Sequence, residues 1–561
     1  MQLATMKKNK NLTYALVTIV LLLLVNFIAS KAYQRFDLTE DNRYTLSEVS
    51  TNLINDLESP LIIDVFLEGD FPSEFRLLQT ETRQIIEEFQ LETNNLVVNY
   101  INPIEDEETR QRNIEELTKS GLEPYINTDN STGKVTQDII FPWAFASYKD
   151  KTVKIPLLKR SITEPLPEQI ANSIQSLEYA FADAFNKLVN PKAKKIAILK
   201  GNGELGDIYI ADFLKTLQPY YNIGPFTLDS VSTNPQGTLE NLEQYDLIVA
   251  AKPSIAFTEN EKLVLDQYTM HGGKSLWLTE SVIMDKDSLY NTSRSGVSII
   301  KDLRLNDFFF KYGVRVNPSL VKDLFSAPIM LAIGEGSQAQ LQPIQWQYSP
   351  LASSNPNHPI SKNLNLVKFD FASPIDTLKN DIKKTVLLES SPNSKLEGVP
   401  TTISLADVTK SPEEASYNSG PQNLAVLLEG KFTSVYDKRV LPFKVNDFKS
   451  KSRPTKMVII SDGDIIKNEV VRNRPQQLGF DQLSGKEFGN KEFLLNTVNY
   501  LLDDSGLINI RGKEISVAYL DTEKVAEEKG TWQLINIALP LVLLVLFGFV
   551  FNYFRKRKYT R

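Results

Sequence analysis

The residues best suited to bind a ligand form a glycine-rich turn, Gly201-Asn-Gly-Glu-Leu-Gly206. An apolar run that predicts a strand precedes the turn, a predicted helix follows it, and Asp229 lies farther along. This order formally matches the dinucleotide-binding fingerprint, in which glycines let the backbone approach a pyrophosphate. Glu204, however, places a carboxylate where a helix N-terminus favours an anionic ligand. We therefore expect a structural turn or a protein-contact loop at Asn202 and Glu204, and no cofactor.

A second motif, Gly273-Lys274-Ser275, resembles the end of a phosphate-binding loop. The first glycine of such a loop would fall at Tyr268, and the triplet precedes a predicted strand instead of following one. The triplet therefore predicts a turn. We expect the chain to have no nucleotide-hydrolysing site of its own, so an ATP-driven role requires another subunit.

A third motif, Asp462-Gly-Asp464, closes the apolar run from Met457 to Ile460. The carboxyl ends of strands are where open α/β sheets bind ligands, so contact with a cation or ligand is one interpretation. The other is an acidic turn that caps a helix beginning at Ile465, because Asp is a favoured N-cap residue. We favour the turn and keep Asn202, Glu204, Asp462 and Asp464 as the candidate contact or ligand cleft.

The composition excludes several kinds of chemistry. The chain has no cysteine, which excludes disulfides, thiolate metal sites and thiol nucleophiles. Its two histidines, His271 and His358, are far apart in sequence, which argues against a zinc site or a histidine-based triad. The net charge of −7 is spread along the chain without an internal basic run, which argues against nucleic acid as a partner. We expect no catalytic residue and no metal.

Two apolar segments near the ends of the chain predict membrane-spanning helices, at residues 12–30 and 532–553. Ser30-Lys31-Ala32 is only a weak signal-peptide cleavage site, so an uncleaved anchor is the favoured interpretation of the first segment. Lysines in residues 1–11 and the basic tail 554–561 flank the two spans. The positive-inside rule then places both termini in the cytoplasm and the bulk of the chain in the periplasm.

The intervening residues predict two α/β domains. Residues 31–190 follow the order β-α-β-α-β-β-α, which is that of a thioredoxin-like domain, although dithiol chemistry is excluded. Residues 191–510 alternate strands and helices, which predicts a mostly parallel, doubly wound sheet. An insertion at about 284–453 interrupts this pattern, and residues 511–531 predict a charged stem leading to the membrane.

Four separated stretches resemble a known family: RFDLTEDNRYTLSEVS (35–50), LKGNGELGD (199–207), LDQYTMHGGKSLWL (265–278) and GNKEFLLNTVNYLLDDSGLINIRGKE (489–514). They are similar to the gliding-motility-associated ABC transporter auxiliary proteins, the GldG family. The resemblance runs from the first span to the C-terminal tail. It implies an inner-membrane complex, embedded in the lipid bilayer, with a polytopic permease and a cytoplasmic ATPase that serve gliding motility.

The second domain also resembles the class I glutamine amidotransferase-like fold, whose active members carry a nucleophilic cysteine on a sharp strand-to-helix turn. Because this chain lacks cysteine, the fold can carry over but the chemistry cannot. Our leading hypothesis is a non-enzymatic accessory subunit of an ABC-type complex whose periplasmic body binds partner proteins. The alternative is a periplasmic solute-binding component with a ligand near Asn202, Glu204 and Asp462.

Overall fold

The computed structural model describes residues 14, 16–27, 37, 39, 43, 45–55, 57–129, 136–161, 163–333, 340–513 and 522–559. The chain divides into two units, residues 1–514 and residues 515–561. Both predicted α/β domains therefore belong to one unit, and the C-terminal apolar helix belongs to the other.

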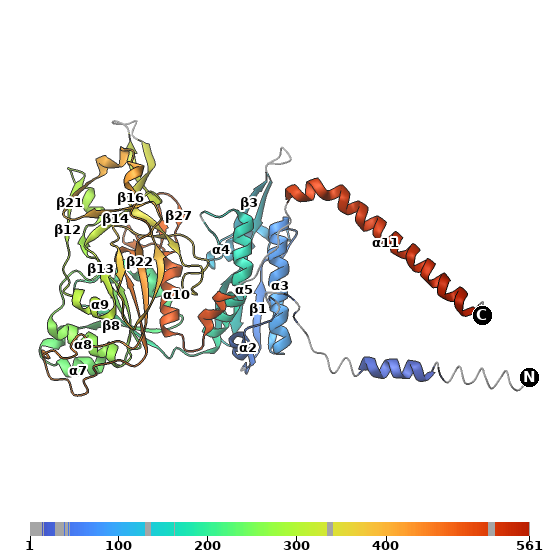
Figure 1. Cartoon of the computed structure of the whole chain (residues 1–561), viewed down its shortest axis with the longest axis horizontal. Helices are drawn as coiled ribbons and strands as arrows, with labels where there is room; N and C mark the ends of the chain where they lie inside the picture. Colours follow the sequence, from blue (N-terminus) through green and yellow to red (C-terminus); the bar gives the residue numbers. More distant parts are fainter. Residues whose placement is uncertain are drawn as a thin grey trace, which may run out of the picture. The chain divides into compact units, whose positions relative to one another are not determined.

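The first α/β domain of the larger unit contains strands and helices between residues 48 and 189 (Figure 1). They are α2 (Glu48–Asn55), β1 (Leu61–Val65), α3 (Ser73–Glu92), β2 (Leu96–Tyr100), α4 (Arg110–Lys119), β3 (Tyr125–Asp129), β4 (Thr136–Ile140), β5 (Trp143–Tyr148), β6 (Lys151–Pro156) and α5 (Leu166–Val189).

Four of these strands form a sheet in the order β2-β1-β5-β6, in which only β1 and β2 run parallel. The sequence predicts one strand from Ile139 to Tyr148, but the structure has two, β4 and β5. Pro142 lies between them, and proline has no N–H to continue a ladder. As a result β4 pairs with β3 in a separate hairpin, which the sequence pattern did not predict.

The second domain begins with an alternation of strands and helices. These are β7 (Lys195–Lys200), α6 (Ala211–Leu217), β8 (Asn222–Thr227), α7 (Pro235–Leu242), β9 (Leu247–Ala251), α8 (Glu259–Met270) and β10 (Lys274–Leu278). The later elements are β11 (Val282–Ile283), β12 (Ser295–Ile300), α9 (Asn306–Tyr312), β13 (Val314–Val316), β14 (Ser319–Asp323), β15 (Ser326–Ile333), β16 (Gln340–Ser354), β17 (Val367–Lys368), β18 (Ile375–Thr377), β19 (Lys383–Glu389), β20 (Ser394–Gly398), β21 (Thr401–Ser404), β22 (Asn423–Gly430), β23 (Thr455–Ile460), β24 (Val470–Val471), β25 (Arg474–Pro475), β26 (Phe480–Asp481), β27 (Lys486–Glu487) and α10 (Asn490–Leu502).

One large sheet organises this domain, in the order β15-β16-β19-β22-β23-β10-β9-β7-β8. The strands from β23 to β8 are parallel, whereas those from β15 to β22 are antiparallel. The sheet is therefore mixed, not mostly parallel as the sequence predicts. The predicted insertion at 284–453 supplies β16, β19 and β22 of this sheet, so much of it extends the main core.

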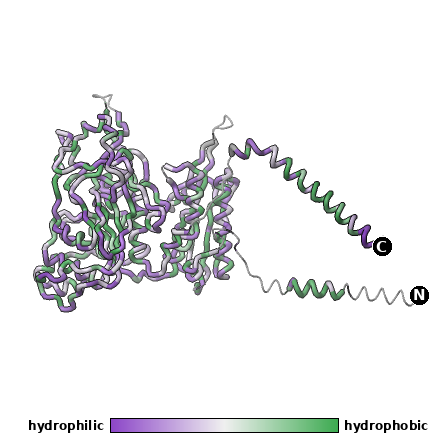
Figure 2. The backbone as a smooth tube through the Cα atoms, in the orientation of Figure 1, coloured by the Kyte–Doolittle hydropathy of each residue, from purple (hydrophilic) through white to green (hydrophobic). Residues whose placement is uncertain are grey.

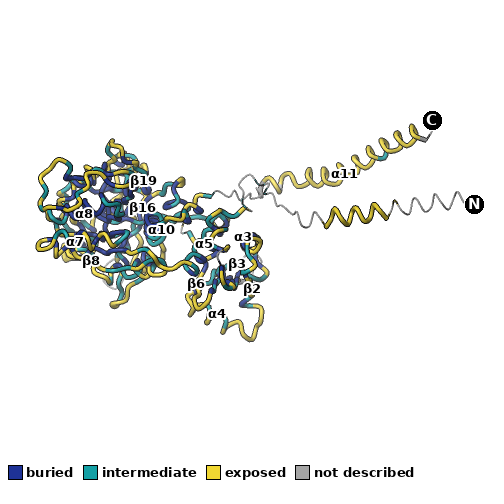
Figure 3. Tube along the Cα trace, turned by 90° about the horizontal axis from the view of Figure 1, so that it is seen from below, coloured by how far each residue is buried: buried dark blue, intermediate teal, exposed yellow. Residues whose placement is uncertain are grey.

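Helices cover both faces of the parallel half of the sheet, because its strands are apolar on both sides. On β7, Ala197 and Leu199 face a core shared with α7, α8 and α9. Ile196 and Ile198 face the opposite core, which is shared with α6 and α10. Figure 3 shows the buried residues concentrated in this region of the chain.

Polar contacts join the two α/β domains. Lys159, which follows β6, lies 2.6 Å from the carboxylate of Glu492 in α10, and Arg511 lies 3.0 Å from the same carboxylate. The Tyr220 hydroxyl of the second domain donates to Asp183 of α5 at 2.9 Å. Arg511, the first residue of the predicted charged stem, is buried.

The smaller unit contains α11 (Thr522–Tyr559), which begins within the predicted stem. Residues Glu527–Lys558 of this helix are long and apolar enough to cross a membrane, with a mean hydropathy of 2.7 in their most apolar window. Figure 2 shows this apolar stretch in green. The described part of the first predicted span, Leu16–Phe27, is a shorter apolar helix, and the rest of that span lies outside the described residues.

Candidate functional site

The four candidate residues all follow the carboxyl ends of parallel strands. Asn202 and Glu204 follow β7, and Asp462 and Asp464 follow β23. The parallel strands lie side by side in the order β8, β7, β9, β10 and β23. When they are numbered by their order in the chain, this is the doubly wound order 2-1-3-4-5. In such sheets, ligands bind outside the carboxyl ends of the strands where the winding reverses, which here is between β7 and β9.

The glycine-rich turn after β7 is closed by its own side chains and by the loop after β9. The Asn202 amide donates to the Glu204 carboxylate at 2.9 Å, and the Leu205 amide donates to the carbonyl of Ala251 at 3.0 Å. The amides of Ser254 and Ile255 both donate to the Asn202 carbonyl at 2.9 Å. Burial raises the pKa of Glu204. The backbone amides of Asn202 and Leu205 are therefore already hydrogen-bonded, the first to a carboxylate and the second to a strand carbonyl.

The segment that follows the turn does not fit a dinucleotide site either. The sequence predicts one helix from Ile208 to Leu217, but the structure has a short 3-10 helix, Asp207–Tyr209, and then the seven-residue α6. A dinucleotide fingerprint requires a helix N-terminus directed at the pyrophosphate. The arrangement is that of a structural turn.

Replacing Gly203 with valine should therefore lower folding stability without affecting any cofactor. Gly203 has a φ of +73°, a conformation that side chains other than glycine rarely adopt, and an added Cβ would lie 2.1 Å from the Ser254 hydroxyl. We expect a loss of about 2–3 kcal/mol in unfolding free energy, measured by urea denaturation. As a control, Gly420→Val has a similar φ of +74° but nothing within 4 Å of the added Cβ, so it should cost less.

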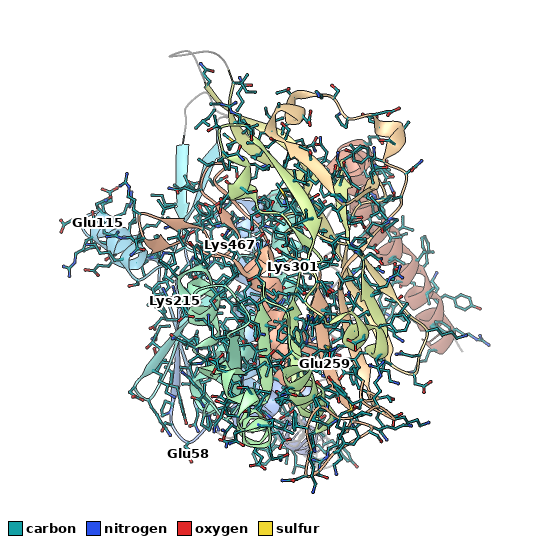
Figure 4. The ribbon with its side chains drawn as sticks, turned by 90° about the vertical axis from the view of Figure 1, so that its left-hand side faces the viewer. Glu58, Glu115, Lys215, Glu259, Lys301 and Lys467 are labelled. Carbon is teal, nitrogen blue, oxygen red and sulfur yellow. The ribbon has the colours of Figure 1, made fainter. Side chains whose placement is uncertain are left out.

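A buried lysine organises the neighbouring strand ends. Lys252 directly follows β9, is 8% exposed and has a φ of +56°. Its ammonium lies 2.6 Å from Asp285, 2.7 Å from Asp464 and 3.0 Å from Glu280. Glu280, which follows β10, also contacts Lys301 at 2.6 Å. Lys301 is labelled in Figure 4 together with Lys467, which lies 3.4 Å from Asp287.

Asp462 is completely buried and holds its own turn. One of its carboxylate oxygens accepts from the Asp464 amide at 2.7 Å, and the other accepts from the Asp370 amide at 2.6 Å. The first of these bonds is the local contact expected of an aspartate in a turn. The helical turn that follows, Asp464–Ile466, is a 3-10 helix with Gly463 as its N-cap. It therefore begins one residue before the predicted start at Ile465, and its N-cap is not the predicted aspartate.

The cluster contains more buried carboxylates than ammonium groups, and this imbalance shifts the pKa values of its members. Burial, the Asp464 carboxylate and the Glu280 carboxylate raise the pKa of Asp462 well above its ordinary value. Burial raises the pKa of Asp464 to about 6, although Lys252 acts to lower it. Burial alone would lower the pKa of Lys252, but the carboxylates of Asp464, Glu280 and Asp285 outweigh it and raise that pKa.

These contacts limit what the cluster can do chemically. A lysine nucleophile requires a lowered pKa, whereas the Lys252 ammonium is held in its charged form. The carboxylates of Glu280, Asp462 and Asp464 have oxygens within 4.8 Å of one another, a grouping that could hold a metal ion. The Lys252 ammonium already contacts two of these three carboxylates, those of Glu280 and Asp464. The cluster is therefore a closed ion network that joins the ends of β9, β10 and β23.

The structure places the four predicted residues at the same end of the sheet but in two separate contact groups. The loop after β9 connects the groups, because Lys252 contacts Asp464 while Ser254 and Ile255 contact Asn202. Neither Lys252 nor Glu280 was predicted from the sequence. Their signal was available, because each is a charged residue within two positions of the end of a strand that closes with an apolar run.

The remaining motifs have structural roles. Gly273 lies in the turn before β10, and an added Cβ there would lie 2.3 Å from the ring of Tyr268. The predicted turn is confirmed only in part, because Lys274 and Ser275 of the triplet already belong to β10. His271 is the C-cap of α8, and its ring lies 2.7 Å from Glu243.

A family model described as an ABC-type uncharacterized transport system matches residues 193–497, which is more than half of the chain. The chain belongs to this family. The match covers the second domain with its mixed sheet and the Lys252 network. A second model, described as a domain of unknown function, matches residues 40–147 in the first domain. Membership of this family identifies the chain as an auxiliary component of an ABC-type transport system. The match does not extend to the more specific assignment to gliding motility.

Individual proteins show only distant similarity to this chain. An uncharacterized protein of Borreliella burgdorferi is 20% identical over 396 residues, which cover 69% of this chain and 71% of the relative. Among solved structures, the N-terminal domain of mmIFT52 aligns with a TM-score of 0.30 and 14% identity, over 55% of this chain and 99% of that one.

Proposed function

We propose that this chain is a non-enzymatic accessory subunit of an ABC-type inner-membrane complex, and that its large periplasmic body binds partner proteins. The match of residues 193–497 to the ABC-type transport family carries this proposal. The partners would be a membrane permease and a cytoplasmic ATPase, because this chain has no recognisable nucleotide-hydrolysing motif. The four stretches that resemble the gliding-motility proteins support gliding motility as the process served.

The proposed topology has two spans, residues 12–30 and 532–553, with both termini in the cytoplasm. The apolar length of α11 supports the second span, and basic residues beside each apolar segment support the orientation. A contact within the larger unit agrees with it. The Lys513 ammonium donates to the carbonyl of Thr45 at 2.7 Å. The chain therefore enters and leaves the body at neighbouring points, as two spans of one membrane require.

We further propose a thioredoxin-like fold for the first domain and a class I glutamine amidotransferase-like fold for the second. The order β2-β1-β5-β6 with one parallel pair supports the first assignment. The order 2-1-3-4-5 of the parallel strands supports the second. Lys252 directly follows the central parallel strand with a left-handed backbone, and its neutralised ammonium supports a scaffold instead of a catalytic centre.

Co-purification from native membranes tests the proposal. The full chain, tagged at its C-terminus and extracted in mild detergent, should bring the permease and ATPase subunits with it. A variant with Leu543→Lys and Leu546→Lys places two charges in the apolar part of α11, where each is costly in a bilayer, and should lose these partners. Lys383→Ala, at a side chain that is 71% exposed, should keep them.

Recovery of the chain alone from cells in which all three subunits are expressed would contradict the proposal. A saturable small solute that stabilises the body would instead support the solute-binding alternative, since a ligand at a hundredfold excess over its Kd adds about 2.7 kcal/mol.

A further inference from the structure

The antiparallel edge of the large sheet extends into a two-stranded ribbon. The pairing of β15 with β16 continues without interruption from Pro328 opposite Gln345 to Ile333 opposite Gln340. The far half of this ribbon is exposed, including Ala332, Leu341 and Pro343. In Figure 1 the ribbon lies at the top of the second domain, near the label β16.

One face of the ribbon packs on the body. Residues paired directly across two strands point to the same side, and successive residues alternate between sides. Ile329, Leu331 and Ile344 therefore share a face, together with Trp346. These side chains join a hydrophobic core with Leu320 of β14 and Ile403 of β21, which accounts for their apolar character.

The far end of the opposite face is also apolar, although it is exposed. This end presents Met330 and Ala332 from β15 and, opposite them, Pro343 and Leu341 from β16, and the polar Gln345, opposite Pro328, comes next on the same face. Leu341 is 60% exposed. An antiparallel ribbon with one wet face normally alternates apolar and polar residues, and exposed sheet edges usually carry charge. Residues 326–333 and 340–350 contain no charged residue at all. This face therefore has the composition of a surface that another layer covers.

The size and chemistry of this face limit what can cover it. Six residues of strand span about 20 Å, so the two strands present roughly 200 Å². A stable interface between two freely diffusing proteins needs about 800 Å² per partner, so a second copy of this chain is a poor occupant. A lipid surface is also a poor occupant, because membrane-binding surfaces use basic and aromatic residues, which this face lacks. A partner already held beside this chain needs much less area.

We propose that this face, defined by Met330, Ala332, Leu341 and Pro343, docks on an uncharged, apolar periplasmic surface of the permease subunit. The inference rests on the proposed function, because only a partner held in the same membrane has the raised local concentration that so small a contact requires. Direct contact would join the permease to the edge of the sheet whose parallel half contains the Lys252 network.

Site-specific photo-crosslinking in native membranes tests the contact. A photoreactive residue at Leu341 should crosslink to the permease, whereas the same residue at Val440, a valine that is 93% exposed, should not. The double variant Ala332→Glu and Leu341→Glu should reduce co-purified permease roughly tenfold, because it buries two charges against an apolar surface. Val440→Glu should leave the yield unchanged. An unchanged thermal unfolding temperature in the double variant would show that the body is folded.

The other outcomes overturn the inference. A crosslink from Leu341 to a second copy of this chain, to lipid alone, or to nothing would remove the permease from this face. An undiminished yield with the double variant would do the same. Because the wild-type complex is isolated in the same experiment, its absence would instead count against the proposed function, and its presence with a failed crosslink would count only against this contact.

Discussion

Replacing Lys252 with methionine is expected to lower the free energy of unfolding by about 3–5 kcal/mol. The ammonium of Lys252 lies within 3.0 Å of three carboxylates, and the side chains of Glu280 and Asp464 are 7% and 13% exposed. Methionine has a similar length but no charge, so these carboxylates would face one another with less compensation. Urea unfolding of the detergent-solubilised chain measures the loss.

The matched control for this variant is Lys383→Met. Lys383 also pairs with a glutamate, Glu429, at 3.3 Å, but its own side chain is 71% exposed. Water already solvates this pair, so its loss should change the unfolding free energy by less than about 1 kcal/mol. Equal effects of the two variants would contradict a structural role for the Lys252 network.

A shorter substitution tests whether the ammonium stands in for a cation. Lys252→Ala removes the side chain from beside Glu280, Asp462 and Asp464, whose oxygens lie within 4.8 Å of one another. Calcium and manganese favour such oxygen ligands, so either ion should stabilise this variant. At a hundredfold excess over the Kd, the gain is about 2.7 kcal/mol. The wild-type protein should show no gain, because the Lys252 ammonium already lies against Glu280 and Asp464.

The local pattern of the sequence predicted most elements of the parallel half. Leu247–Ala251 and Leu276–Leu278 are continuous apolar runs, which are typical of buried parallel strands, and both lie in strands of the structure, β9 and β10. The helix Glu259–Met270 begins and ends at the predicted residues, and Thr258 and Glu261 form a capping box at its start. These elements are encoded by neighbouring residues, so a single sequence is enough to find them.

The antiparallel half was harder because its pairing is long-range. Lys383–Glu389 was expected within an insertion, but it pairs with Asn423–Gly430 inside the main sheet. Nothing local to either strand indicates which partner it has. The candidate site met the same difficulty. Asp462 and Asp464 were found through their strand, but Lys252 became recognisable only when the fold brought it to Asp464, across more than 200 residues.

The second large effect should come from Lys513, where the body leads toward α11. Lys513→Met is expected to lower the free energy of unfolding by about 2–4 kcal/mol. The Lys513 ammonium lies 3.0 Å from the carboxylate of Glu178, a residue of α5 that is 2% exposed. The other oxygen of that carboxylate accepts from the Ser47 amide at 2.7 Å and from the Ser50 hydroxyl at 2.8 Å. Methionine would leave a buried carboxylate without its cation.

The same contacts give this variant a consequence that the Lys252 variant lacks. Because Lys513 also donates to the carbonyl of Thr45, it joins the segments by which the chain enters and leaves the body. Hydrogen exchange at α2, which begins at Glu48, should therefore accelerate in Lys513→Met more than in Lys252→Met. Lys149→Met, which breaks the exposed pair with Glu58, should not accelerate exchange at α2. Uniform acceleration across the body in Lys513→Met would show that Lys513 stabilises the fold generally and does not join the two segments in particular.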